Sequence, residues 1–172
     1  MSSPGEPVDR PLDIKGLLAV LARHGVDYVV IGGVATQVHG HRRTTMDLDL
    51  TPDPDPENLT RLAAALDELE ARPLDEGLTG AEISVGDLER LALAAIVPPL
   101  LTRHGQIHIL KEPKGSRTFE RLRDAALVVE IGGVEVAIVS LDDLVRMKRA
   151  GGRPRDLDDI AALAEAAKQA EG

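Results

Sequence analysis

The chain has 172 residues, a usual length for one folded domain with a sizeable core, and a formal net charge of −9. It contains no cysteine, which excludes disulfides and thiolate chemistry, and no run of the about 20 apolar residues that a membrane helix needs. The acidic balance and the scarcity of aromatic residues argue against a broad nucleic-acid surface, because such surfaces neutralise phosphates and stack bases. We therefore expect a single cytoplasmic domain over residues 12–172, preceded by a flexible leader at residues 1–11.

The first part of the chain predicts a helix and two strands that lead to a pair of acids. Apolar residues at helical spacing predict a helix over residues 12–24, and a nearly continuous apolar run over residues 26–31 predicts a strand buried on both faces. The segment MDLDL alternates apolar and acidic residues, so a strand there would direct Asp47 and Asp49 to one face. The opposite face, toward the core, would carry Met46, Leu48 and Leu50.

Two helices are predicted between this strand and the next. In the sequence PDPDP, Asp55 is a good N-cap and Pro56 a good first helical residue, so these acids are more typical of caps and turns than of metal ligands. The helix that follows would bury one apolar stripe, made of Leu59, Leu62, Ala63, Leu66 and Leu69. Residues 84–87 predict a cap for a further helix over residues 88–95.

The second half of the chain predicts three strands. The sequence QIHIL at residues 106–110 alternates, so His108 would face away from its apolar neighbours. Gly132-Gly133 predicts a two-residue hairpin turn between strands over residues 128–131 and 134–139, because glycine adopts the positive φ angles that such a turn requires. The sequence therefore indicates strands and helices in mixed order, and we expect an α/β fold.

The C-terminal region predicts two helices separated by a break. Ser140 would cap a helix over residues 141–149, in which Lys148 leaves the same side as the buried residues and could reach a cleft. Gly151-Gly152 and Pro154 would end this helix and start the last one. The last helix would bury a stripe made of Leu157, Ile160, Ala161 and Ala164.

Asp47 and Asp49 carry the strongest indication of chemistry. Two carboxylates on one face of a rigid strand suit a hard cation such as Mg²⁺ or Mn²⁺. Upstream, Gly32 and Gly33 lie where a strand ends, and their unhindered backbone could approach a phosphate at the start of the next helix. A cation site and a phosphate site would then face each other.

This pattern, Gly-Gly followed by Arg43-x-Thr45-x-Asp47-x-Asp49, resembles the signature of the polymerase-beta-type nucleotidyltransferase superfamily. The sequence of this motif is most similar to that of AbiEii-like and MNT-like bacterial members, and a weaker similarity extends to the run SLDDLVRMKRAGGRPRDLDDIAAL. The resemblance implies a nucleotidyltransferase fold, α/β or α+β, with a mixed sheet flanked by helices. It also implies transfer of a nucleoside monophosphate from a nucleoside triphosphate to a hydroxyl of a small molecule, a protein or an RNA end. Many AbiEii-like proteins are toxins, so an antitoxin protein is a candidate partner.

The resemblance also implies roles for individual residues. Asp47 and Asp49 would bind the metal, and Lys148 would contact phosphate, with Asp156 orienting either Lys148 or Arg153. The acids Asp158 and Asp159 are explained by the dipole of the last helix alone. The candidate nucleotide-binding residues are Gly32, Gly33, Arg43, Thr45, Arg153 and Asp156. The candidate catalytic residues are Asp47, Asp49, Lys148 and His108.

His108 stands where many active members of the superfamily carry a third acid. Three explanations are open. Glu112 or Glu130 replaces the missing acid, His108 itself acts as ligand or base, or the site binds nucleotide without turnover and the chain acts through a protein partner. A basic run over residues 146–155 offers one more interpretation, an RNA-binding protein.

Other polar residues near the motif are less specific. His39 and His41 form a short His-x-His, which we interpret as structural or solvent-facing rather than as a metal pair. Arg42 is equally compatible with a phosphate contact and with an exposed loop position.

Overall fold

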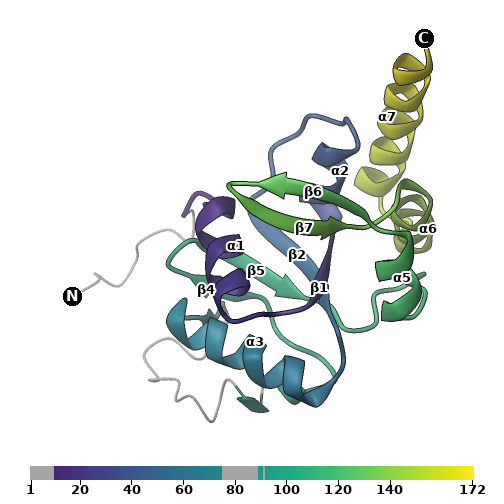
Figure 1. Cartoon of the computed structure of the whole chain (residues 1–172). Coiled ribbons are helices and arrows are strands. Elements are labelled where there is room, and N and C mark those ends of the chain that lie inside the picture. The colour runs from purple at the N-terminus through teal and green to yellow at the C-terminus, as the bar shows by residue number, and fades with distance from the viewer. Residues whose placement is uncertain (1–9, 75–88, 91) are drawn as a thin grey trace.

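The computed structural model describes residues 10–74, 89–90 and 92–172. Its strands are β1 (Tyr28–Ile31), β2 (Asp47–Pro52), β3 (Arg72–Pro73), β4 (Leu100–Thr102), β5 (Gly105–Ile109), β6 (Leu127–Ile131) and β7 (Val134–Ile138). Its helices are α1 (Ile14–Arg23), α2 (Gly32–Val38), α3 (Pro56–Glu68), α5 (Phe119–Ala125), α6 (Leu141–Gly151) and α7 (Pro154–Glu171). The strands form one mixed seven-stranded sheet in the order β3-β4-β5-β2-β1-β7-β6, with helices around it (Figure 1). The expected α/β class is confirmed.

The centre of the sheet positions the acid pair. β2 pairs antiparallel with β1 on one side and parallel with β5 on the other, and this register places Asp49 opposite His108. β1 also pairs in parallel with β7, which forms an antiparallel hairpin with β6. Gly132 and Gly133 make the hairpin turn with φ angles of +58° and +81°, so that prediction is confirmed. Because β2 has a neighbour on both edges, its backbone is held on both sides.

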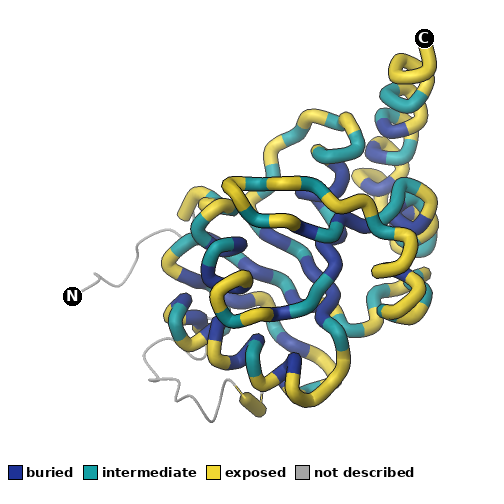
Figure 2. Tube along the Cα trace, viewed as in Figure 1, coloured by how far each residue is buried: buried dark blue, intermediate teal, exposed yellow. Residues whose placement is uncertain are grey.

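The core includes the predicted apolar face of α3. All five residues of that stripe are buried, namely Leu59, Leu62, Ala63, Leu66 and Leu69. The start of α3 also agrees with the prediction, since the side chain of Asp55 accepts a hydrogen bond from the backbone N–H of Glu57 and Pro56 is the first helical residue. α1 contacts α3 and buries Leu17, Leu18 and Leu21 completely. Figure 2 shows the buried segments running through the central strands and the sides of the helices that face them.

The predicted inward position of Met46 is wrong. Met46 is 38% exposed, whereas Leu48 and Leu50 of the same alternating segment are fully buried. The reason is that β2 begins at Asp47, so Met46 lies in the preceding loop. Alternation fixes which face a residue takes only where the backbone is actually paired in a sheet.

The predicted apolar stripe of α7 is also wrong. Leu157 is 55% exposed, and the side of the helix that is buried instead carries Asp156, Asp159 and Leu163. Acids can occupy a buried helix side when cations of other elements pair with them. The C-terminal half of α7 projects from the rest of the molecule and is largely exposed (Figures 1 and 2).

Some expectations concern residues that the structure does not describe. Residues 1–9 of the expected leader lie outside the described part of the chain, as do residues 84–87 and part of the helix expected over residues 88–95. Within the described ranges, no helix combines the length and the apolar character needed to cross a bilayer.

Candidate functional site

Asp47, Asp49 and His108 meet on neighbouring strands. Nδ1 of His108 lies 3.2 Å from Oδ2 of Asp47 and 3.2 Å from Oδ1 of Asp49. One ligand atom from each of the three side chains lies within 4.8 Å of the others, and no other such trio of His, Asp or Glu occurs in the described part of the chain. The side chains of Asp47, Asp49 and His108 are 26%, 17% and 30% exposed, so an ion could reach them from solvent. We call these three residues the acid–histidine group.

The electrostatics of the acid–histidine group favour a bound cation. Oδ1 of Asp49 is buried, and its only contact among the described residues is the one at 3.2 Å with Nδ1 of His108, so an ion or water could still satisfy it. Hydrogen bonding to Asp49 raises the pKa of His108, burial opposes this rise, and the charges of Asp49 and Asp47 add to it. Two carboxylates held side by side thus attract positive charge, and the residues present fit a divalent ion.

The Gly32-Gly33 pair lies directly against this group. Gly32 has a φ of +66°, and a Cβ added to it would lie 1.9 Å from Oδ2 of Asp49. A Cβ added to Gly33 would lie 2.6 Å from Oγ1 of Thr45. The hydroxyl of Thr45 lies 3.1 Å from the backbone oxygen of Asp47 and 3.2 Å from its Oδ1 and donates toward both. Only glycine permits this approach, and the pair forms the first two residues of α2 rather than a turn ahead of it.

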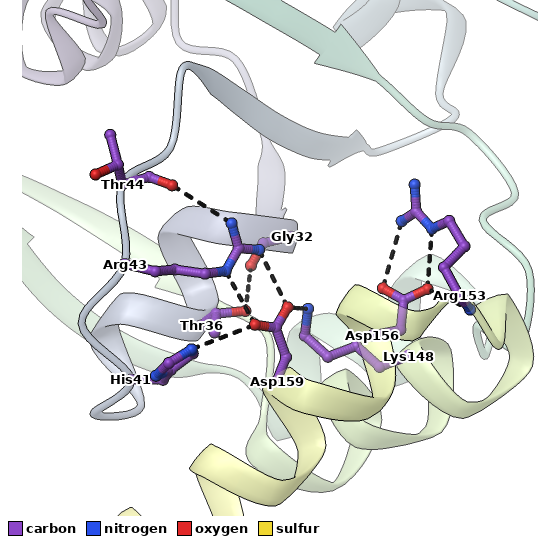
Figure 3. Close-up of polar contacts among 9 residues, drawn as sticks. All are labelled: Gly32, Thr36, His41, Arg43, Thr44, Lys148, Arg153, Asp156 and Asp159. Carbon is purple, nitrogen blue, oxygen red and sulfur yellow. Dashed lines mark hydrogen bonds and ion pairs between the residues drawn. The ribbon is translucent and has the colours of Figure 1, made fainter.

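Asp159 is contacted by two cationic side chains, Arg43 and Lys148, and by the imidazole of His41. Its Oδ2 accepts hydrogen bonds from Nζ of Lys148 at 2.7 Å and from Nη2 of Arg43 at 3.2 Å. Its Oδ1 lies 3.0 Å from Nε of Arg43 and 3.4 Å from Nε2 of His41. Figure 3 shows these side chains converging from the loop after α2, from α6 and from α7. We call Asp159 with His41, Arg43 and Lys148 the Asp159 cluster.

Within the Asp159 cluster, Asp159 and Lys148 form a buried ion pair, whereas Arg43 and His41 are partly exposed. Asp159 is 1% exposed and Lys148 7% exposed. Burial alone would raise the pKa of Asp159, but the hydrogen bonds and charges of Lys148 and Arg43 outweigh it and hold that pKa below its usual value. The carboxylate therefore stays ionised and fixes the position of both cations.

Arg153 and Asp156 form a separate pair at the start of α7. The carboxylate of Asp156 accepts hydrogen bonds from Nε of Arg153 at 2.9 Å and from its backbone N–H at 3.2 Å (Figure 3). Asp156 thus orients Arg153, whereas Lys148 is oriented by Asp159. The pKa of Arg153 is raised chiefly by Asp156, with smaller contributions from the charges of Asp49 and Asp159, so the guanidinium lies within electrostatic reach of the acid–histidine group.

Solved structures share this arrangement of elements. The antibiotic-resistance factor ANT(2")-Ia, solved in complex with adenylyl-2"-tobramycin, aligns over 90% of this chain and 88% of its own with a TM-score of 0.54 and 14% identity. A Thermotoga maritima structure described as a nucleotidyltransferase aligns over 88% and 90% with a TM-score of 0.53 and 13% identity. An antigenic nucleotidyltransferase-like protein from Paracoccidioides brasiliensis aligns over 87% and 72% with a TM-score of 0.52 and 17% identity. The chain has the nucleotidyltransferase fold. The sequence matches no family model and no curated protein. Because the identities to the solved structures are only 13–17%, the likeness to them concerns the fold alone.

Within this nucleotidyltransferase fold, neither Glu112 nor Glu130 reaches the place of the third acid. Glu130 is exposed on the edge strand β6, which β1 and β7 separate from β2. Glu112 follows the end of β5 and lines a different hollow, beside Lys111 and Arg117. His108 is the side chain that the fold presents to both aspartates.

The His-x-His of the loop after α2 does not form a metal pair. A ring nitrogen of His39 lies 2.7 Å from the backbone oxygen of Val139, and His41 is directed to Asp159. Both contacts are structural, as the sequence indicated.

Sequence reasoning missed Asp159. The helix dipole alone accounts for an acid at this position, but the structure buries Asp159 and pairs it with Arg43 and Lys148. A usable signal was present, because Asp156, Asp159 and Leu163 follow one another at the spacing of a single helix side, which is unexpected for two acids unless they are paired.

Proposed function

We propose that this chain is a metal-dependent nucleotidyltransferase that moves a nucleoside monophosphate from a nucleoside triphosphate to an acceptor hydroxyl. The hydroxyl oxygen would form a bond to the α-phosphorus while the bond from that phosphorus to the oxygen bridging the β-phosphate breaks. Pyrophosphate would leave with the electron pair, and the hydroxyl proton would pass to solvent or a nearby base. The observation that best supports this proposal is the acid–histidine group lying against the Gly32-Gly33 backbone.

The acid–histidine group is the proposed metal site. Asp47, Asp49 and His108 would hold the ion, which neutralises charge on the phosphate oxygens when bound. Thr45 donates to Asp47 and fixes its orientation, and the absence of a side chain at Gly32 lets backbone and carboxylate approach closely. These are contacts of strands and of a helix start, so the group is preorganised rather than assembled on binding.

Arg43, Lys148 and Arg153 would neutralise the polyphosphate. Each is already paired with an acid, but a guanidinium has five N–H donors and an ammonium three, so donors remain for a ligand. Arg43 also borders an open hollow of about 570 Å³ together with Gln37, Arg42 and Thr44, so one side of its guanidinium is accessible from solvent. The paired acids would hold the cations in place and reduce the ordering cost of binding.

Incubation with α-labelled nucleoside triphosphates and Mg²⁺ or Mn²⁺ tests the proposal, with pyrophosphate release and label transfer as readouts. Asp47→Asn and Asp49→Asn should each lower transfer by at least about 100-fold, which is similar to the loss of one charge-stabilising group in other enzymes. Asp142→Asn, on an exposed position of α6, is the matched control and should leave transfer unchanged. Nucleotide binding without turnover under every condition would refute the proposal and favour a non-catalytic binding module.

The acceptor and the biological partner are part of the proposal. ANT(2")-Ia was solved with an adenylated tobramycin, so amino-sugar hydroxyls belong among the acceptors to test, beside protein side chains and RNA ends. The AbiEii resemblance also predicts a toxin with an antitoxin, acting in the cytoplasm where nucleoside triphosphates are abundant. Growth arrest on expression of the wild-type chain, absent with Asp47→Asn, would support that role; normal growth with active enzyme would contradict it.

A further inference from the structure

We infer that His108 is a metal ligand, through Nδ1, and that it gives the site a preference for a first-row transition ion such as Mn²⁺ over Mg²⁺. The inference rests on the proposed function, because it takes the acid–histidine group to be the metal site. The inference goes beyond the proposed function because it assigns the imidazole of His108 a role in determining which ion binds.

The two contacts of His108 match the separation of neighbouring ligands on one ion, and one ligand atom from each of the three side chains lies within 4.8 Å of the others. Nδ1 of His108 lies 3.2 Å from an oxygen of each aspartate. Neighbouring ligand atoms in an octahedral site with bonds of about 2.1 Å are about 3.0 Å apart. Asp49 and His108 are paired residues of two parallel strands, so backbone hydrogen bonding fixes this separation. Nδ1 of His108 thus already lies at about the separation that a ligand would have from each aspartate oxygen on one ion.

The identity of the third ligand decides which ion is favoured. Mg²⁺ takes oxygen ligands, demands near-ideal octahedral geometry and gives up water reluctantly. An imidazole nitrogen is a softer donor that suits transition ions, and Mn²⁺ also accepts the carboxylate and phosphate oxygens that complete the site. Replacing a third carboxylate by His108 therefore removes negative charge, which weakens Mg²⁺ binding, and adds a ligand that Mn²⁺ uses better.

A competing explanation assigns His108 the opposite role. As a fixed cation between Asp47 and Asp49, it would occupy the place of the ion and oppose metal binding. The two explanations predict opposite changes in metal affinity when His108 is replaced. If His108 is a ligand, its removal weakens Mn²⁺ binding; if it replaces the ion, its removal strengthens the binding of both Mn²⁺ and Mg²⁺.

Electron paramagnetic resonance of the full chain with Mn²⁺ and inorganic tripolyphosphate, which contains no nitrogen, tests this directly. In the wild type, pulsed spectra should contain the ¹⁴N coupling of a bound imidazole. His108→Asn should abolish this coupling and lower Mn²⁺ affinity by at least about tenfold, the lower end of what even an outer-shell change costs. His108→Asp should also abolish it, and competition should show a lower ratio of Mn²⁺ to Mg²⁺ affinity. His104→Asn, on the β4–β5 turn, is the control and should change neither.

Each result separates this inference from the proposed function. Wild-type protein without ¹⁴N coupling, or His108→Asn with unchanged or tighter Mn²⁺ binding, would overturn the role of His108 even if nucleotide transfer is observed. Coupling that is present and lost on substitution would support it even if no acceptor is found, because the readout does not depend on turnover. Thermal unfolding of each variant would show that the altered binding does not come from unfolding.

Discussion

Substitution of Asp159 by asparagine should destabilise the protein strongly although the change is small in size. Asp159 is 1% exposed and is the shared partner of Lys148, Arg43 and His41. The asparagine side chain is neutral, so the ammonium of Lys148, which is 7% exposed, would lose the charge of the carboxylate that it contacts directly. Arg43 and His41 are 18% and 28% exposed, so they could turn toward water and recover part of their hydration.

The magnitude follows from this difference in exposure. Removing one partner of a buried ion pair typically costs about 3–5 kcal/mol. Since one cation of the cluster is buried and the amide oxygen of asparagine can still accept a hydrogen bond, we expect the lower end, about 3 kcal/mol in the free energy of unfolding. For a chain of this size, each kcal/mol lowers the melting temperature by about 2–4 °C, so the expected decrease is about 6–12 °C.

Urea unfolding at neutral pH, followed by circular dichroism, measures this cost. Asp158→Asn is the matched control: it is the neighbouring acid of the same helix, it is exposed, and it should change the free energy of unfolding by less than about 0.5 kcal/mol. A double-mutant cycle with Lys148→Met should give a coupling of at least about 1 kcal/mol, because the two side chains are in direct contact. If Asp159→Asn and Asp158→Asn unfold at the same urea concentration, the buried cluster is refuted.

Two further predictions concern the backbone and the pH dependence. Gly133→Ala and Gly32→Ala both place a side chain at positive φ, at a cost of about 1–2 kcal/mol, but the added Cβ meets nothing within 4 Å at Gly133 and lies 1.9 Å from Asp49 at Gly32. Only Gly32→Ala should therefore also lose Mn²⁺ binding, and equal binding by both variants would contradict the close approach. The pKa of Asp159 is lowered in the folded protein, so its stabilisation is present above the unfolded pKa of about 3.9 and is lost as pH falls through the folded pKa. The stability difference between wild type and Asp159→Asn should accordingly shrink below about pH 4; a difference independent of pH down to about 2 would show that charge is not its cause.

Local periodicity was sufficient for much of the fold and for one half of the candidate site. Alternation alone placed Asp47 and Asp49 on one face of a strand and His108 opposite its apolar neighbours, because strand side chains have a period of two. It could not predict that β2 and β5 are paired so that Asp49 lies beside His108, since pairing of distant strands depends on the whole sheet. Met46 shows the same limit, because alternation continues past the point where pairing ends.

The other half of the site depends on contacts that no local pattern contains. Asp159 accepts hydrogen bonds from Lys148, 11 residues away in the sequence, and from Arg43, 116 residues away. An acid near the start of a helix is expected because of the helix dipole, whether or not it has such partners. Its burial could be inferred only by asking why two acids share a helix side with Leu163.

The two halves of the site are held by different means, so they should respond differently to substitution. Arg43 belongs to the loop that runs from α2 to the acid-bearing β2, and Lys148 belongs to α6, yet both are held by one carboxylate of α7. Loss of that carboxylate would release both cations at once, while Asp47, Asp49 and His108 are fixed by strand pairing and would remain. Nucleotide affinity in Asp159→Asn, measured at a temperature where the variant is folded, should therefore fall while Mn²⁺ binding is retained. Parallel loss of both would mean that the acid–histidine group is not held independently by the sheet.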